Sequence, residues 1–174
     1  MLLYTAMMGR SGRRAESANA APPRWLTATQ LEAWRAFTLL LARLPTALEQ
    51  QLQRDAALSY IEYYALAGLS EAPEHTMRMS ELAVLTNAEL SRLSHLISRL
   101  EKRGYVRREP DPTDGRYTNA VLTETGSECV VAAAPGHVAT VRELVIDALD
   151  DGELDTLRAI ATRIIAGIDD PGRC

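Results

Sequence analysis

Residues 90–126 read LSRLSHLISRLEKRGYVRREPDPTDGRYTNAVLTETG, and this stretch decides the fold. Its first part predicts a helix with one buried face, because apolar side chains recur at the i, i+3, i+4, i+7 spacing. These side chains are Leu93, Leu96, Ile97 and Leu100. Gly104 follows and is expected to stop the helix just after residue 103. The opposite face offers serine, arginine and histidine to whatever lies beside it.

The sequence after this helix predicts a β-hairpin. Segments 105–108 and 119–122 are its expected strands, and the loop between them contains two prolines and Gly115, as hairpin tips do. Before the helix, Ser80 is expected to cap a short helix over 81–85. A turn at residues 86–87 then makes the pair a helix-turn-helix. A mainly α fold follows: a winged helix-turn-helix with a two-stranded β wing, the arrangement that binds duplex DNA in many regulators.

The distribution of charge favours nucleic acid more than the net charge of −4 does. Residues 88–116 carry seven basic and five acidic side chains, a net charge of +2. Residues 142–170 carry three arginines and eight acids, a net charge of −5. This asymmetry fits a protein that presents one face to phosphates.

Bulk properties exclude several other classes of protein. The 174 residues are 47% hydrophobic and 24% charged, an ordinary globular composition. The two cysteines, Cys129 and Cys174, exclude a disulfide framework, and no Cys/His spacing indicates a metal, so no metal or cofactor is expected. We expect neither a secretory signal nor a membrane span. The prediction is a cytoplasmic, nucleoid-associated protein with no membrane partner.

Four regions are predicted along the chain. Residues 1–24 form a mobile arm, 25–56 an N-terminal dimerisation helix, 57–126 the DNA-binding region, and 127–174 the C-terminal dimerisation helices. We expect Pro45 to interrupt the first helix.

Capping patterns locate further helix starts. Thr27 with Gln30, and Ser59 with Glu62, have the spacing of a capping box, and Gly68 is the expected end of the second helix. Long helices are then expected from residue 123 and after residue 152. Their apolar faces exceed what the small winged core can cover, so they pack either on each other or on a second copy. Flanking helices suit a two-fold dimer on a palindromic site.

The chain resembles the MarR (multiple antibiotic resistance regulator) family over residues 27–168. Four motifs in this order carry the resemblance: RMSELA at 78–83, LSHLISRLEKRGYVRR at 93–108, DPTDGR at 111–116 and LTETG at 122–126. The resemblance implies a winged-helix dimer that binds a short palindrome. It also implies release from DNA by small molecules, often phenols or aromatic carboxylates, or by thiol oxidation.

The resemblance also implies DNA contacts. The recognition helix corresponds to residues 87–103, whose N-terminal half enters the major groove, and the wing signature aspartate-x-arginine corresponds to Asp114 and Arg116. Arg116 is then the minor-groove probe, and Asp114 orients its guanidinium. The predicted DNA-binding residues are Ser91, Arg92, Ser94, His95, Arg99, Lys102, Arg108, Asp114 and Arg116.

Some of these residues allow two interpretations. Arg92 contacts a base or phosphate, or pairs with Glu89; His95 enters the groove or flanks it. Lys102 contacts phosphates or complements the helix dipole. Arg107 and Arg108 alternate along a strand, so only one readily faces DNA.

Family ligands bind in a cleft between the dimerisation helices and the winged region. The candidate ligand-binding residues here are Trp34, Tyr60, Tyr63, Tyr64 and His137, with plain core or dimer packing as the alternative. The sequence lacks a cysteine before Cys129, so the family's peroxide-sensing arrangement does not transfer.

The function predicted is a sequence-specific, dimeric transcriptional repressor released by a small aromatic or phenolic ligand, and not an enzyme. The alternatives are a DNA-binding regulator without a ligand, activating or architectural, and a thiol-based redox sensor through Cys129.

Overall fold

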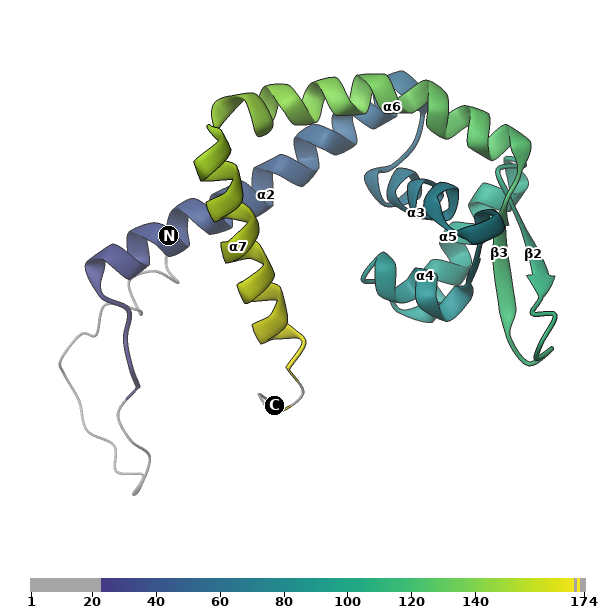
Figure 1. Ribbon diagram of the computed structural model, residues 1–174, viewed down its shortest axis with the longest axis horizontal. Helices are drawn as coiled ribbons and strands as arrows, with labels where there is room; N and C mark the ends of the chain where they lie inside the picture. Colours follow the sequence, from purple (N-terminus) through teal and green to yellow (C-terminus); the bar gives the residue numbers. More distant parts are fainter. Residues whose placement is uncertain (1–22, 171, 173–174) are drawn as a thin grey trace. The chain divides into compact units, whose positions relative to one another are not determined.

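The computed structural model describes residues 23–170 and 172 (Figure 1). The predicted mobile arm falls outside the described residues except at its last two positions, and Cys174 falls outside as well. The chain divides into two compact units, residues 1–44 and 45–174.

Helix α2 (Ala28–Ala56) begins with the predicted capping box. The backbone N–H of Thr27 donates to Gln30 Oε1 at 3.0 Å, and the N–H of Gln30 donates to Thr27 Oγ1 at 3.3 Å. The predicted interruption at Pro45 is wrong, because α2 continues through it. Proline costs one helical hydrogen bond, but burial of the next turns, including Leu52, holds the helix in place.

Helix α3 (Tyr60–Glu71) carries the predicted capping box of Ser59 and Glu62. Gly68 does not end it, contrary to the prediction. A Cβ at Gly68 would lie 2.2 Å from Leu85 Cδ2, so this glycine serves close packing inside the helix. The helix ends before Pro73, whose ring disfavours helical backbone in the residue preceding it.

The helix-turn-helix consists of α4 (Met79–Leu85) and α5 (Leu90–Lys102). Helix α4 is capped at Arg78 rather than at the predicted Ser80, and Asn87 makes the turn with a φ of 47°. Asparagine tolerates this left-handed backbone better than most residues. The four apolar side chains predicted for α5 are all buried, at 4% exposure or less.

The wing belongs to a three-stranded antiparallel sheet in the order β1-β3-β2. Figure 1 labels β2 and β3 of this sheet. The strands are β1 (Thr76–Arg78), β2 (Val106–Pro110) and β3 (Thr118–Leu122). The predicted hairpin is confirmed as β2 and β3, with Arg108 opposite Ala120. Strand β1 is an addition that the sequence did not predict. Together with α3, α4 and α5 the sheet forms the expected winged helix-turn-helix around one apolar core.

Two long helices complete the chain, α6 (Glu124–Leu144) and α7 (Asp151–Ile168). The predicted start of α6 is confirmed, since the Thr123 side chain accepts from the Gly126 N–H. Helix α7 begins at Asp151, two residues before the predicted start, because the Asp150 side chain accepts from the Glu153 N–H and caps it. The expectation of no membrane span is not overturned, although one helix has the length and apolarity of a span, as core helices of soluble proteins also can. Among the described residues, the stretch Glu124–Ala148 is long and apolar enough to span a membrane by length and composition alone.

Candidate nucleic-acid interface

The outer face of α5 is polar and open. Its apolar stripe faces the core, which leaves Ser91, Arg92 and His95 exposed on the other side. Arg92 forms no ion pair with any residue that the structure describes, and the predicted alternative, pairing with Glu89, is not among the ion pairs observed. Arg99 and Lys102 are exposed along the same face, which therefore offers three cations and several short hydrogen-bonding side chains.

Arg108 braces the hairpin against α5. Its Nη2 donates to the carbonyl oxygen of Ser94 at 2.7 Å and to Ser98 Oγ at 3.2 Å, and its Nη1 lies 3.2 Å from Glu101 Oε2. Arg107 pairs instead with Glu109 at 2.7 Å, two residues along the same strand, as alternation requires. Arg108 is thus the arginine of the two that lies beside the recognition helix.

Glu62, which the sequence predicted only as part of a capping box, ties α5 to α3. Its carboxylate is buried and accepts from Arg99 Nε at 3.1 Å, with Arg103 Nη1 at 4.0 Å. Burial acts to raise the pKa of Glu62, but hydrogen bonds from the Ser59 backbone and Arg99 outweigh it and lower the net pKa. Arg99, predicted to contact DNA, therefore also holds α5 in place.

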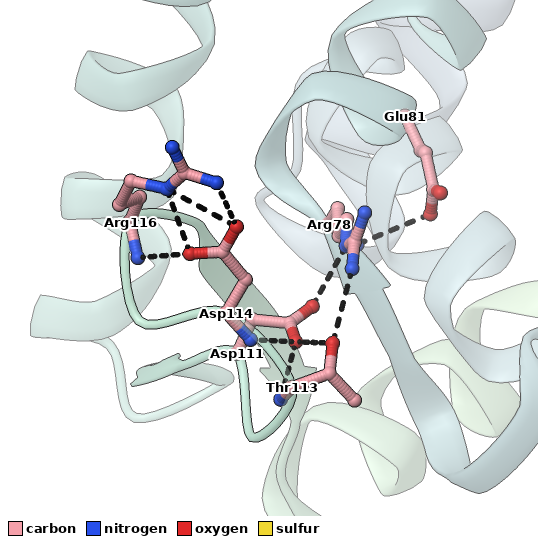
Figure 2. A network of polar contacts seen from close by, with 6 residues as sticks. All are labelled: Arg78, Glu81, Asp111, Thr113, Asp114 and Arg116. Carbon is pink, nitrogen blue, oxygen red and sulfur yellow. Dashed lines mark hydrogen bonds and ion pairs between the residues drawn. The ribbon is translucent and has the colours of Figure 1, made fainter.

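The wing tip presents a pre-oriented arginine (Figure 2). Arg116 Nε lies 3.0 and 3.1 Å from the two oxygens of Asp114, and its Nη2 lies 2.6 Å from Oδ2. The pairing implied by the family resemblance is thus present. Arg116 lowers the pKa of Asp114, and its own side chain is 85% exposed. A cation held in this way loses less rotamer entropy when it binds.

A second ion pair lies at the base of the wing tip (Figure 2). Asp111 is buried and accepts from Arg78 Nε at 2.7 Å, which with Thr113 holds the pKa of this carboxyl well below its usual range. Both residues lie within the motifs at 78–83 and 111–116, but the sequence predicted a role for neither. An aspartate followed by proline in a loop is a turn-forming signal, because its side chain accepts from the backbone two residues on, and this signal could have found Asp111.

The recognition helix and the wing enclose a hollow of about 410 Å³. Its walls come from α4, α5, β2 and the hairpin, and include Ser94, Arg108 and Arg116. Three of the nine predicted DNA-binding residues, Ser94, Arg108 and Arg116, thus line one hollow, whereas Arg92 and Arg99 line a separate one beside Leu93 and Leu96.

Four of the five predicted ligand-binding residues gather between α3 and α6. The rings of Tyr63 and His137 lie 4.6 Å apart between centroids, and those of Tyr60 and Tyr64 stack at 6.1 Å. Burial lowers the pKa of His137 and raises those of Tyr60 and Tyr63. Trp34 belongs to the other unit, where its ring lies 6.3 Å from that of Phe37.

A recognition helix with an open polar face, beside a hairpin that exposes an arginine, defines a winged-helix DNA-binding regulator. The MarR family profile matches residues 58–116. The chain belongs to the MarR family of transcriptional regulators, which are DNA-binding proteins and not enzymes.

Known relatives support this assignment over most of the chain. The crystal structure of Sco3205, a MarR regulator from Streptomyces coelicolor in complex with DNA, is 40% identical with a TM-score of 0.84, covering 88% of this chain and 96% of Sco3205. AbsC from the same organism is 41% identical with a TM-score of 0.81, covering 84% of this chain and 98% of AbsC. The Escherichia coli repressor MprA is 27% identical over 107 residues, and this match spans 62% of the chain and 60% of MprA.

Proposed function

We propose that this regulator is a homodimeric, cytoplasmic repressor that binds a palindromic operator through α5 and the wing and is released by a small aromatic ligand. The observation that carries the DNA-binding proposal is Arg116, 85% exposed at the wing tip and held by both oxygens of Asp114. A pre-oriented guanidinium of this kind suits a narrow minor groove.

The remaining contacts divide by position on the surface. Ser91, Arg92, Ser94 and His95, in the first half of α5, are the proposed major-groove contacts. Arg99, Lys102 and Arg108 are the proposed phosphate contacts. Arg99 and Arg108 also have protein partners, so part of each guanidinium is engaged before DNA arrives.

Unsatisfied apolar surface supports the dimer. The C-terminal half of α7 exposes Ile160, Ile164 and Ile168, and α2 exposes a run of leucines at 39–41. Apolar faces of this extent on a chain from a soluble DNA-binding family indicate a protein interface. The proposed dimer uses the predicted N- and C-terminal dimerisation helices, and it also accounts for the apolar character of α6.

The ligand proposal rests on the aromatic cluster of Tyr60, Tyr63, Tyr64 and His137. Aromatic side chains with polar tips suit a phenol or an aromatic carboxylate. Repression itself depends on where the operator lies relative to a promoter, and MprA is a repressor by name. A thiol sensor through Cys129 is the weaker alternative, because that thiol is partly buried against the core.

The test is fluorescence anisotropy on duplex DNA from upstream of the chain's own gene, with random duplex as the control. We expect preferential binding by about 10³-fold or more, with two protomers per site. Addition of salicylate, as a simple aromatic carboxylate, should release the duplex. Binding without preference would leave the architectural alternative, and preference without release would leave a regulator that responds to no such ligand.

Two substitutions locate the contacts. Arg116→Ala should weaken binding and lower the slope of log affinity against log salt by roughly 1, because one cation leaves the interface. Arg92→Ala should cost about 1–3 kcal/mol on the preferred duplex if it reads a base edge, and little on random DNA. Arg107→Ala is the matched control, since that hairpin arginine pairs with Glu109. An Arg116 variant that bound like the Arg107 variant would remove the wing from the mechanism.

A further inference from the structure

We propose that Arg78 and Asp111 form a positioning pair that sets the direction of Arg116, so that the helix-turn-helix and the wing meet DNA as one rigid surface. This inference rests on the proposed function, in which Arg116 contacts DNA. Arg78 itself is a positioning residue that acts through Asp111 and Asp114.

The tip of the wing lies outside the sheet. Strand β2 ends at Pro110 and β3 begins at Thr118, so residues 111–117 have no continuous ladder of strand hydrogen bonds. Two backbone bonds close the loop: Asp111 N–H to the Tyr117 carbonyl and Tyr117 N–H to the Asp114 carbonyl, both at 3.0 Å. With Gly115 next to Arg116, side-chain contacts must supply most of the remaining order.

Asp111 supplies those contacts. Its Oδ1 accepts from the Thr113 backbone at 2.8 Å, from Thr113 Oγ1 at 2.6 Å and from the Asp114 backbone at 3.2 Å. The carboxylate is 7% exposed, and a buried carboxylate keeps its charge only with such partners. The position of the Asp114 backbone, and with it the Asp114 carboxylate that holds Arg116, follows from Asp111.

Arg78 fixes the other oxygen of Asp111 to the helix-turn-helix. Its backbone lies opposite Asn119 in the sheet, and its N–H donates to Glu81 Oε2 at 3.3 Å as the cap of α4. Its guanidinium donates from Nε to Asp111 Oδ2 at 2.7 Å and lies 4.8 Å from the centroid of the Tyr117 ring. One side chain therefore joins the start of α4 to both sides of the wing loop.

The contacts run in series from the sheet to the exposed tip of the wing (Figure 2). Arg78 holds Asp111, Asp111 holds the backbone of Asp114, and the Asp114 carboxylate holds Arg116. Loss of the first contact releases the last, although Arg78 and Arg116 make no hydrogen bond or ion pair with each other in the structure. The two arginines thus have different tasks: Arg78, at the end of β1, orients, and Arg116, in the wing loop, binds.

A double-mutant cycle tests this order. Affinity for the upstream duplex is measured by anisotropy for the wild type, Arg78→Met, Arg116→Ala and the double variant. Arg78→Met should weaken binding by about tenfold in the wild-type background, a typical coupling for residues in one network, and should have almost no effect when Arg116 is already absent. Arg107→Met is the matched control and should leave affinity unchanged in both backgrounds.

Other outcomes overturn the proposal. An equal loss in both backgrounds would make Arg78 a direct phosphate contact if the salt slope also fell, or a purely structural residue if it did not. If Arg78→Met lowers the melting temperature, Asp111→Asn replaces it in the same cycle, since the amide keeps the shape and loses the charge. Loss of binding in both backgrounds by that variant would equally exclude positioning.

A measurement without DNA separates this inference from the proposed function. The heteronuclear ¹⁵N NOE of the Arg116 Nε–Hε group reports its order in the free dimer. Arg78→Met should lower this NOE towards that of a free side chain, and Arg107→Met should not. An unchanged NOE would refute the positioning role even if DNA binding were confirmed. A lowered NOE would support it even if the duplex bound without preference.

Discussion

Helices α5 and α7 carry the same apolar pattern but have different surroundings. In α5 the side chains of Leu93 and Ile97 are fully buried within the chain. In α7 the side chains of Ile160 and Ile164 have similar spacing and are 41% and 39% exposed. The same apolar spacing therefore marks a face that is buried within the chain in α5 and a face that is left exposed in α7.

The difference separates two kinds of stability in this protein. The winged region owes its order to contacts within one chain, including the Glu62 carboxylate that ties α5 to α3. The face of α7 gains its stabilisation only when another surface covers it, which in the proposed function is a second copy. The first kind is independent of protein concentration, whereas the second follows mass action.

The largest expected effect comes from the face of α7. Ile160→Gln with Ile164→Gln should convert the dimer to monomer, because each buried isoleucine side chain is worth about 1.5–3 kcal/mol and the dimer contains both twice. The dissociation constant should rise at least about 100-fold, measured by sedimentation velocity. Arg158→Gln with Thr162→Gln, at exposed positions on the opposite side of α7, is the control. A double Ile variant that stayed dimeric would place the interface elsewhere.

A core substitution in α5 should lower the stability of the single chain rather than the affinity between chains, and its cost in free energy should be slightly smaller. Ile97→Ala should cost about 2–5 kcal/mol of unfolding free energy, since it leaves a cavity in a fully buried site. Urea denaturation should give the same loss at every protein concentration. His95→Ala, at an exposed position on the same helix, should change stability by about 0.5 kcal/mol or less. A concentration-dependent loss for Ile97→Ala would erase the distinction between the two helices.

The periodic elements were predictable from the sequence, and the exceptions have physical reasons. Helices α5, α6 and α7 followed from apolar spacing and capping residues. Strand β1 did not, because three residues, Thr76–Arg78, are too few to show alternation. Gly68 was misread as a helix end because its role is a contact with Leu85, which lies 17 residues further along the chain.

The same limit applies to the candidate site. The pairing of Asp114 with Arg116 is local and follows from the resemblance. The ion pairs of Arg78 with Asp111 and of Glu62 with Arg99 join residues 33 and 37 positions apart. No periodicity or motif reports such a contact, because the fold alone brings the partners together.

The smallest expected effects concern two ion pairs, one with a buried carboxylate and one exposed to solvent. Glu62→Gln should cost about 1–3 kcal/mol at neutral pH, since a buried acceptor with several donors is weakened. The folded protein lowers the pKa of Glu62 below its ordinary value of 4.5. Its contribution is therefore present above that value and lost as pH falls through the folded pKa, so the wild type and variant should converge in acid.

The control for Glu62 lies on α7. Asp155 pairs with Arg158 at 3.0 Å, and both side chains are more than three-quarters exposed. Asp155→Asn should change the free energy of unfolding by about 0.5 kcal/mol or less, because solvent screens such a pair. Equal losses for the two variants, measured by urea denaturation at pH 7, would mean that burial of Glu62 adds nothing.

The close approach at Gly126 couples the tilt of α6 to the position of the wing. A Cβ there would lie 2.1 Å from the carbonyl oxygen of Tyr105, so the first turn of α6 rests directly on the backbone that leads into β2. At about 1.5 Å per residue, the 21 residues of α6 extend roughly 30 Å from this fulcrum. A tilt of about 4° at the fulcrum displaces the far end of such a rod by about 2 Å. In the proposed dimer, small changes of the angle between the two subunits would thereby displace the hairpin that carries Arg116.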